Sequence, residues 1–247
     1  MATPPAPSRV MKGTLVHINA DSLELSASRG PVYGPLTFEI GDGLSVLRGD
    51  VGSGRTSLLL TLAGRMRPGA GELTVGEYRL PHHLRAVQKL SSVCGFAGID
   101  DLEDSVTVGA ALRERRAWLS PWFSLVRKLN DVDVAQVCRP VFGSEPIPHA
   151  GTIIWDLSDT QKFLLRITLA LMSGPEILFV DDLEQVRSRE SRAVLWGRLA
   201  HIASESTAVV VSATSLDADL WDALESHPEI VDMTHTAAQP ELIEESR

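Results

Sequence analysis

The chain has few cysteines, no long apolar run and no long basic run, and each shortage excludes a class of protein. Cys94 and Cys138 give neither a disulfide framework nor the spacing of a metal site, so we expect two buried, reduced thiols. No apolar run approaches the roughly 18 residues that a bilayer-spanning helix needs. We expect disorder in segment 1–12, which lacks the apolar core of a signal peptide, and in the acidic tail 236–247.

The overall charge also limits the choice of partner. The formal net charge is −9, from 32 acidic and 23 basic residues. Such a chain is a poor match for the polyanionic backbone of nucleic acid, so we expect no nucleic-acid partner. The length of 247 residues, of which 44% are hydrophobic, is sufficient for a sizeable core in one large domain or two small ones.

The most informative segment is glycine-rich and reads Gly49-Asp50-Val51-Gly52-Ser53-Gly54-Arg55-Thr56-Ser57. It matches the phosphate-binding pattern G-x-x-x-x-G-K-[ST] except at Arg55, which replaces the lysine. Glycines let the backbone approach phosphate oxygens, and successive N–H groups form an anion nest. A strand predicted at 44–47 precedes the segment, and a helix predicted at 57–63 directs its N-terminus at the phosphates. Residues 49–57 therefore predict a nucleoside triphosphate site; the alternative is a structural glycine turn.

Short strands alternate with helices along the chain. The apolar runs 177–180 and 208–211 are typical of buried parallel strands. Pro121 is predicted to split 113–130 into two short helical pieces. The other predicted elements are strands at 36–40 and 72–75 and helices at 134–142, 160–172 and 190–203. This order predicts an α/β fold with a parallel-sheet core and a helical insertion.

Two carboxylates end the apolar strand 177–180, at Asp181 and Asp182. In phosphate-loop NTPases, an aspartate at the end of the neighbouring strand holds Mg²⁺ together with the loop serine or threonine. Those roles fall here to Asp181 and Thr56. The alternative is a buried strand whose acidic residues are simply solvated at its exit.

The order of motifs resembles that of the ATP-binding cassette (ABC) ATPases, from about Leu15 to Asp222. Segment 64–73 is similar to the segment that follows the first helix in the family. Segment 106–108 is similar to the segment that opens the family's helical subdomain. Leu157-Ser158-Asp159-Thr160-Gln161 stands where the family has its LSGGQ signature.

The resemblance implies a P-loop NTPase parallel-sheet core with a helical insertion subdomain at about 99–172, inside one domain at 13–235. It implies ATP and Mg²⁺ as cofactors, with Asp182 in the position of the catalytic glutamate. It also implies that Ser158 and Gln161 contact nucleotide across a pair of cassettes.

The chain departs from the family at residues that carry the chemistry. Arg55 is longer and planar, unlike the compact ammonium of lysine. Asp182 is one methylene shorter than glutamate, which withdraws its carboxylate by about 1.5 Å. Such a displacement from the attacking water can cost about 10²-fold in rate. These changes predict weakened nucleotide binding and slow or absent hydrolysis.

Further departures surround the same positions. The family's glutamine is expected near 97–99 and its switch histidine at Ala213, and neither is present; Ser212 and Thr214 can bond a phosphate there. The signature lacks both glycines, and Asp159 adds a negative charge. The aromatic residue that stacks on adenine in the family is missing. Arg29 could stack on the base instead, and Tyr33 is a less well placed substitute.

The resemblance implies an ATP-binding subunit of a membrane ABC transporter, cytoplasmic and peripheral at the inner face of the cell membrane. Its partners would be an integral membrane transporter subunit and a second cassette, in a homodimer or a heterodimer. One alternative is a non-catalytic regulatory or structural cassette that assembles or gates a membrane complex. Another is a soluble cassette acting on nucleic acid or ribosomes, against which the acidic charge argues.

Aromatic and acidic clusters in the insertion have two interpretations each. Trp118, Trp122 and Phe123 are expected to pack beneath the insertion, or else to dock on a membrane subunit. The acidic run 100–104 is expected to be a solvated loop, or else to meet basic residues of a membrane partner. We also expect three other tryptophans to pack in the core or between helices, namely Trp155, Trp196 and Trp221.

Overall fold

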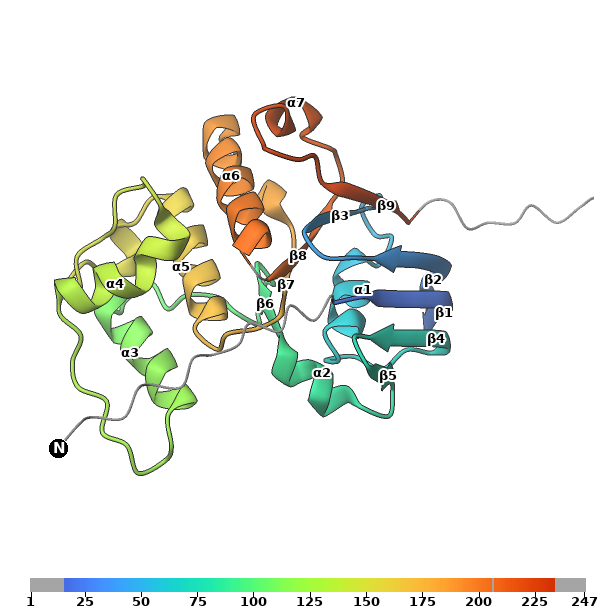
Figure 1. Ribbon diagram of the computed structural model, residues 1–247, viewed down its shortest axis with the longest axis horizontal. Coiled ribbons are helices and arrows are strands. Elements are labelled where there is room, and N and C mark those ends of the chain that lie inside the picture. The colour runs from blue at the N-terminus through green and yellow to red at the C-terminus, as the bar shows by residue number, and fades with distance from the viewer. Residues whose placement is uncertain (1–15, 206, 234–247) are drawn as a thin grey trace, which may run out of the picture.

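Two sheets of different type form the scaffold of this computed structural model, which describes residues 16–205 and 207–233. The strands are β1 (Ile18–Ala27), β2 (Gly30–Ile40), β3 (Leu44–Arg48), β4 (Ala70–Val75), β5 (Tyr78–Leu80), β6 (Ser91–Cys94), β7 (Ile177–Val180), β8 (Ala208–Ala213) and β9 (Glu229–Asp232). An antiparallel sheet has the order β2-β1-β4-β5, and a parallel sheet has the order β6-β7-β8-β3-β9 (Figure 1). The predicted tails 1–12 and 236–247 lie outside the described residues.

The helices fall into groups around these sheets. They are α1 (Arg55–Leu62), α2 (Leu84–Leu90), α3 (Val108–Leu119), α4 (Asp131–Phe142), α5 (Asp159–Leu171), α6 (Arg189–Glu205) and α7 (Ala218–Trp221), with 3₁₀ turns η1 (Ile154–Asp156) and η2 (Leu183–Gln185). α3, α4 and α5 gather at the end of the molecule away from the antiparallel sheet (Figure 1). Among the described residues, every helix is too short or too polar to cross a membrane.

The parallel sheet is buried on both faces, which explains the uninterrupted apolar runs of its strands. In β8, Val209 and Val211 join a core that includes residues of α4, α5 and α6. Ala208 and Val210 point the other way, into a core shared with α1 and the antiparallel sheet. Because successive strand residues face opposite sides, one strand contributes to both cores.

The predicted fold class is confirmed. The predicted strands at 44–47, 177–180 and 208–211 are β3, β7 and β8, three neighbours in the parallel sheet. The helix predicted at 160–172 is α5, and the one predicted at 190–203 is α6.

One predicted helical piece is wrong. Helix α3 ends at Leu119, and no helix follows within 120–130. Pro121 holds the preceding Ser120 in an extended conformation, with ψ at 155°. The residues after Pro121 are almost all exposed, so no packing stabilises a second short helix.

The expected packing of the tryptophans is confirmed for two of them only. Trp196 and Trp221 meet edge to face in the core, with ring centroids 5.4 Å apart. Trp118 and Trp155, by contrast, are 78% and 71% exposed. The preferred expectation that Trp118, Trp122 and Phe123 pack beneath the insertion is also wrong, because all three are exposed.

Candidate functional site

The glycine-rich loop lies between β3 and the start of α1. Gly52 and Gly54 have φ of 84° and 82°, in the left-handed region that favours glycine. A Cβ on Gly54 would lie 2.2 Å from the carbonyl oxygen of Val32 in β2, so a larger residue does not fit there. Gly49 N–H donates to the carbonyl of Ala213 at 3.1 Å, which ties the loop to the end of β8.

The start of α1 is arranged to receive an anion. Gly54 occupies the N-cap position, and no side chain caps the helix there. The first N–H groups of a helix lack partners within the helix and carry a partial positive charge. Ser53 Oγ and Arg55 Nη1 are buried in the same loop without a hydrogen-bond partner among the described residues. These unsatisfied donors fit the oxygens of a phosphate group.

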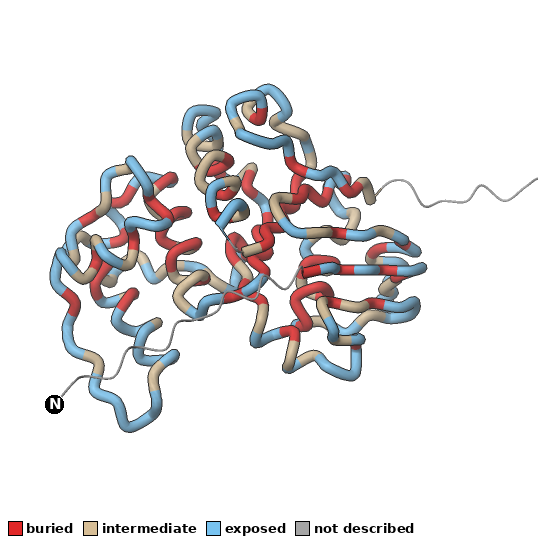
Figure 2. The backbone as a smooth tube through the Cα atoms, viewed as in Figure 1, coloured by how far each residue is buried: buried red, intermediate tan, exposed pale blue. Residues whose placement is uncertain are grey.

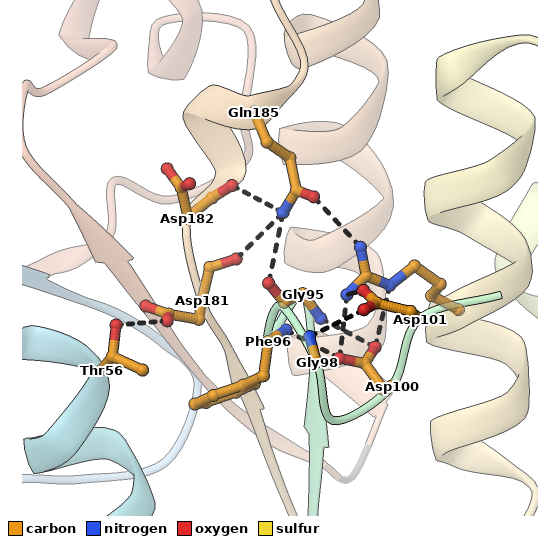
Figure 3. A network of polar contacts seen from close by, with 10 residues as sticks. Thr56, Gly95, Phe96, Gly98, Asp100, Asp101, Asp181, Asp182 and Gln185 are labelled. Atoms are coloured by element: carbon orange, nitrogen blue, oxygen red, sulfur yellow. Dashed lines mark hydrogen bonds and ion pairs between the residues drawn. The ribbon is translucent and has the colours of Figure 1, made fainter.

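A carboxylate at the end of β7 links the loop to the parallel sheet. Thr56 Oγ1 donates to Asp181 Oδ2 at 2.6 Å (Figure 3), and Ser212 Oγ of β8 donates to Asp181 Oδ1. Asp181 is only 5% exposed. A hydroxyl and a carboxylate at this spacing are hard oxygen donors that suit Mg²⁺. Ser212 was expected as a phosphate contact, but its hydroxyl is engaged by Asp181.

Asp182, the next residue, adopts a left-handed conformation with φ of 49°. Its N–H donates to Ser212 Oγ at 3.1 Å, and its carbonyl accepts from Gln185 Nε2 at 2.9 Å. Burial raises the pKa of the Asp182 carboxyl, and Glu184 and Asp181 raise it further, whereas Arg55 acts in the opposite sense. A raised pKa makes a carboxylate a stronger proton acceptor, as a general base requires.

Arg55 faces an acidic residue that the sequence analysis did not single out. Its Nη1 lies 3.7 Å from Glu184 Oε2, and its side chain is 14% exposed. Glu184 Oε1 accepts hydrogen bonds from the N–H groups of Thr214 and Ser215, at 2.7 and 2.8 Å. The only sequence signal for this contact is the position of Glu184 in the polar turn after Asp181 and Asp182.

A second polar network lies beside the site and involves α5. Arg166 makes a two-pronged ion pair with Asp100, at 2.9 Å for each nitrogen, and its Nη1 donates to Gln185 Oε1 at 3.0 Å (Figure 3). Asp100 also accepts from the N–H groups of Gly95 and Phe96. Asp100 is therefore a structural residue, which corrects the expectation of a solvated loop at this position, whereas Asp101 and Glu103 of the same run are exposed.

Gln185 contacts the end of β6, just before the position 97–99 at which a glutamine was expected. Its Nε2 lies 3.3 Å from the carbonyl of Gly95, at the end of β6. The expected position, 97–99, carries no polar side chain and is exposed. The network thus connects the strand ends at the site with α5 of the helical group through Gln185 and Arg166.

The predicted signature residues lie at the start of α5. Ser158 caps the helix by accepting from Gln161 N–H at 3.2 Å, and Gln161 Oε1 accepts from Ser158 N–H at 3.2 Å. Both residues are exposed or partly so. Within the described chain, no hydrogen bond or ion pair joins either of them to loop 49–57. Ser158 and Gln161 are therefore not part of the hydrogen-bond network that the described residues form around this chain's own loop.

The two candidates for stacking on a base have different surroundings. Tyr33 is 4% exposed, and its hydroxyl donates to Thr61 Oγ1 at 2.8 Å, so its ring cannot reach a base. Arg29 is exposed in the turn between β1 and β2. The structure therefore leaves Arg29 as the accessible candidate.

Comparison with curated proteins gives similarity over part of large transporters. No family model matches the chain. The rat phospholipid-transporting ATPase ABCA3 is 23% identical over 197 residues, which cover 80% of this chain and 10% of that protein. ABC transporter G family member 33 of Arabidopsis thaliana is 25% identical over 189 residues, which cover 74% of this chain and 13% of that protein. The chain thus spans about a tenth of the length of these relatives.

Solved structures match over most of the chain. A putative ABC transporter ATP-binding protein from Pyrococcus furiosus has a TM-score of 0.66 at 16% identity, over 88% of this chain and 98% of that one. An ATP-binding cassette of an ABC transporter in its ADP conformation has a TM-score of 0.68 at 12% identity, over 89% and 88%. The chain has the fold of an ABC ATPase cassette, and the resemblance expected from its motifs is confirmed.

Proposed function

We propose that this chain is the ATP-binding cassette of a membrane ABC transporter or an ABC-like membrane complex. It lies peripherally at the cytoplasmic face of the membrane and binds Mg-ATP with slow or no hydrolysis. Residues 13–235 act as a single cassette, with the helical subdomain at about 99–172. Its partners are an integral membrane subunit and a second cassette.

One observation carries the proposal. The glycine-rich loop holds Thr56 within 2.6 Å of Asp181 Oδ2, at the end of β7, which is separated from β3 by β8 in the parallel sheet. This joins a phosphate-binding loop to a carboxylate suited to a divalent cation. The fit is supported by Ser53 Oγ and Arg55 Nη1, which have no hydrogen-bond partner among the described residues.

The chain's own residues divide the work of binding. The N–H groups of residues 49–57 hold the β- and γ-phosphates, and Arg55 contributes positive charge. Thr56 and Asp181 hold Mg²⁺, which neutralises phosphate charge when it is bound. Ser158 and Gln161 meet the nucleotide of the partner cassette. Asp182 accepts a proton from the attacking water in whatever hydrolysis occurs.

A specific observation favours a second candidate, a non-catalytic cassette that assembles or gates a membrane complex. Glu184 lies 3.7 Å from Arg55, so the loop cation faces a carboxylate of the same chain. The positions of the expected glutamine and histidine also lack side chains that could orient water. Both features reduce the capacity for turnover while leaving the anion-binding loop intact.

The decisive experiment titrates the purified chain with Mg-ATP by calorimetry and measures phosphate release in the same sample. Asp182→Asn is the matched control because it removes the proton acceptor and keeps the loop. Binding with turnover that Asp182→Asn abolishes supports a slow ATPase. Binding without turnover above that control supports the non-catalytic cassette. Absence of binding overturns both ATP-dependent proposals for the isolated chain.

A further inference from the structure

The end of α3 and the connection from α3 to α4 expose an unusual concentration of large apolar side chains. Of the eleven such side chains among the described residues, five lie within 118–125. Trp122 is 95% exposed, Phe123 is 73% exposed, and Leu125 is completely exposed. Exposed apolar residues are common singly, but a cluster of this size marks a contact surface.

The part of the cluster beyond α3, residues 122–125, makes little contact with the rest of the fold. Trp122 and Phe123 pack against each other edge to face, with centroids 5.8 Å apart. Ser124 N–H donates to the Pro121 carbonyl at 2.8 Å, which closes a tight turn at the tip. The connection protrudes from the helical group (Figure 1), and it is exposed along nearly all of its length (Figure 2).

Basic residues flank this tip on both sides. Arg113 and Arg116 precede it and Lys128 follows it, and all three are exposed without an ion pair among the described residues. Two other basic residues of the segment are engaged: Arg127 pairs with Asp133 at 2.8 Å, and Arg115 Nε donates to the carbonyl of Leu169 at 2.9 Å. Segment 113–128 has five basic residues and one acidic residue, Glu114, whereas the whole chain has a net charge of −9. The positive charge is therefore concentrated where the apolar side chains protrude.

We propose that the tip, residues 118–125, inserts into the interface of an anionic lipid bilayer. Tryptophan and phenylalanine rings are favourable at the boundary between headgroups and acyl chains. Arginine and lysine beside them reach the lipid phosphates and are attracted by the negative surface potential. Lipid needs no shape match, which suits side chains that project from an irregular loop.

This contact goes beyond the proposed function, since a cassette held only by a membrane subunit needs no lipid. It gives the chain a direct second attachment to the membrane. The glycine-rich loop lies on other elements, between β3 and α1, so the two activities are separable by mutation.

Flotation with vesicles tests the proposal. The purified chain is mixed with phosphatidylcholine vesicles that either contain or lack phosphatidylglycerol. We expect binding to the anionic vesicles, and a fall on the order of tenfold in the partition coefficient for the double variant Trp122→Ser and Phe123→Ser. The matched control is Trp155→Ser, at an exposed tryptophan on η1, which should leave the partition coefficient unchanged.

A second pair of variants tests the charge. Arg116→Gln with Lys128→Gln should weaken binding to anionic vesicles and reduce its salt dependence. Because all these side chains are exposed, the thermal midpoint and Mg-ATP binding should match the wild type. That result separates a failure of lipid binding from a failure of the proposed function.

Two results overturn the proposal. One is absence of vesicle binding by the wild-type chain, or equal binding by the double tip variant. The other is a chain that does not bind vesicles but self-associates through the tip in light scattering, or captures a detergent-solubilised membrane subunit through it. Either finding would make the cluster a protein interface.

Discussion

Arg55 Nη1 and Glu184 Oε2 lie 3.7 Å apart, and the same glutamate accepts two backbone hydrogen bonds after β8 through its other oxygen. A cation in the phosphate-binding loop is thus opposed by a carboxylate that is itself fixed in place. An incoming triphosphate would be repelled by Glu184 and would compete with it for Arg55. We therefore expect the pair to lower the affinity of the loop for a nucleoside triphosphate.

Replacement of Glu184 by glutamine should tighten Mg-ATP binding on the order of tenfold. The amide oxygen preserves an acceptor for the N–H groups of Thr214 and Ser215, while the negative charge is removed. Calorimetry measures the dissociation constant. Glu190→Gln, at an exposed glutamate on α6, is the control and should change nothing. Unchanged affinity in Glu184→Gln would show that the ion pair does not restrain Arg55.

Changes at Arg55 itself test whether its charge serves binding. Arg55→Ala should weaken Mg-ATP binding on the order of tenfold, because a positive charge near the phosphates is lost. Arg55→Lys should bind at least as tightly as the wild type, because the compact ammonium is less suited to a carboxylate fork and matches the loop pattern. Equal Mg-ATP affinity of the wild type and Arg55→Ala would show that Arg55 does not contribute to nucleotide binding.

The threonine of the loop should carry the metal dependence. In the wild type, chelation of Mg²⁺ with EDTA is expected to weaken ATP binding. Thr56→Ala should reduce the difference in ATP affinity with and without Mg²⁺, because one oxygen ligand of the metal is lost. Thr56→Ser keeps the hydroxyl and should preserve that difference. The measurement is the ratio of dissociation constants with and without Mg²⁺. A ratio that is the same in all three proteins contradicts the assignment of Thr56.

Asp182→Asn should stabilise the fold while it abolishes any turnover. The folded state raises the pKa of Asp182, so the ionised form is disfavoured there, and stability contributed by this group increases as pH falls through the folded-state pKa. Asparagine removes the ionised form and also tolerates the left-handed φ of 49°. The thermal midpoint without Mg²⁺ should exceed that of the wild type at pH 7, and the difference should shrink at acidic pH. A gain that is independent of pH would indicate a purely conformational cause.

Neither cysteine should react while the protein remains folded. Burial raises the pKa of Cys138 to about 11, and that of Cys94 lies well above its ordinary value for the same reason. At pH 8, about one part in a thousand of Cys138 would be thiolate, the reactive form. Titration with a chromogenic disulfide should therefore show slow labelling that becomes fast in denaturant. Rapid labelling of the native protein would contradict the burial of both thiols.

The strands and helix around the glycine-rich loop were predictable because their signals are local. Uninterrupted apolar runs identify β7 and β8, and the loop pattern identifies the junction between β3 and α1. β1 escaped prediction because its pairing with β4 is irregular between Asp21 and Glu24, and Ser22 has a positive φ. Such an irregularity disrupts the alternation by which a strand is recognised.

The sequence also indicated that Asp181 follows an apolar strand and that Thr56 lies next to the start of a helix, which the structure begins at Arg55, but it could not show what faces Arg55. The contact with Glu184 depends on how the turn after β7 packs against the loop, and a pattern of residue types does not specify that. The exposure of Trp118, Trp122 and Phe123 was missed for a related reason. Apolar composition favours burial on average, whereas Trp118 lies exposed at the end of α3 and Trp122 and Phe123 lie exposed on the connection that follows it.

Asp181 bonds to Thr56 and Ser212, which stand 125 residues before it and 31 residues after it. These contacts require α1, β7 and β8 to be in place together, and long-range contacts of this kind form late in folding. During synthesis, the glycine-rich loop leaves the ribosome well before β7 does. We therefore expect a nascent chain to remain unable to recognise its ligand until β8 has emerged, so that assembly of the site reports the joining of β3, β8 and β7, before the edge strand β9 is added to the parallel sheet.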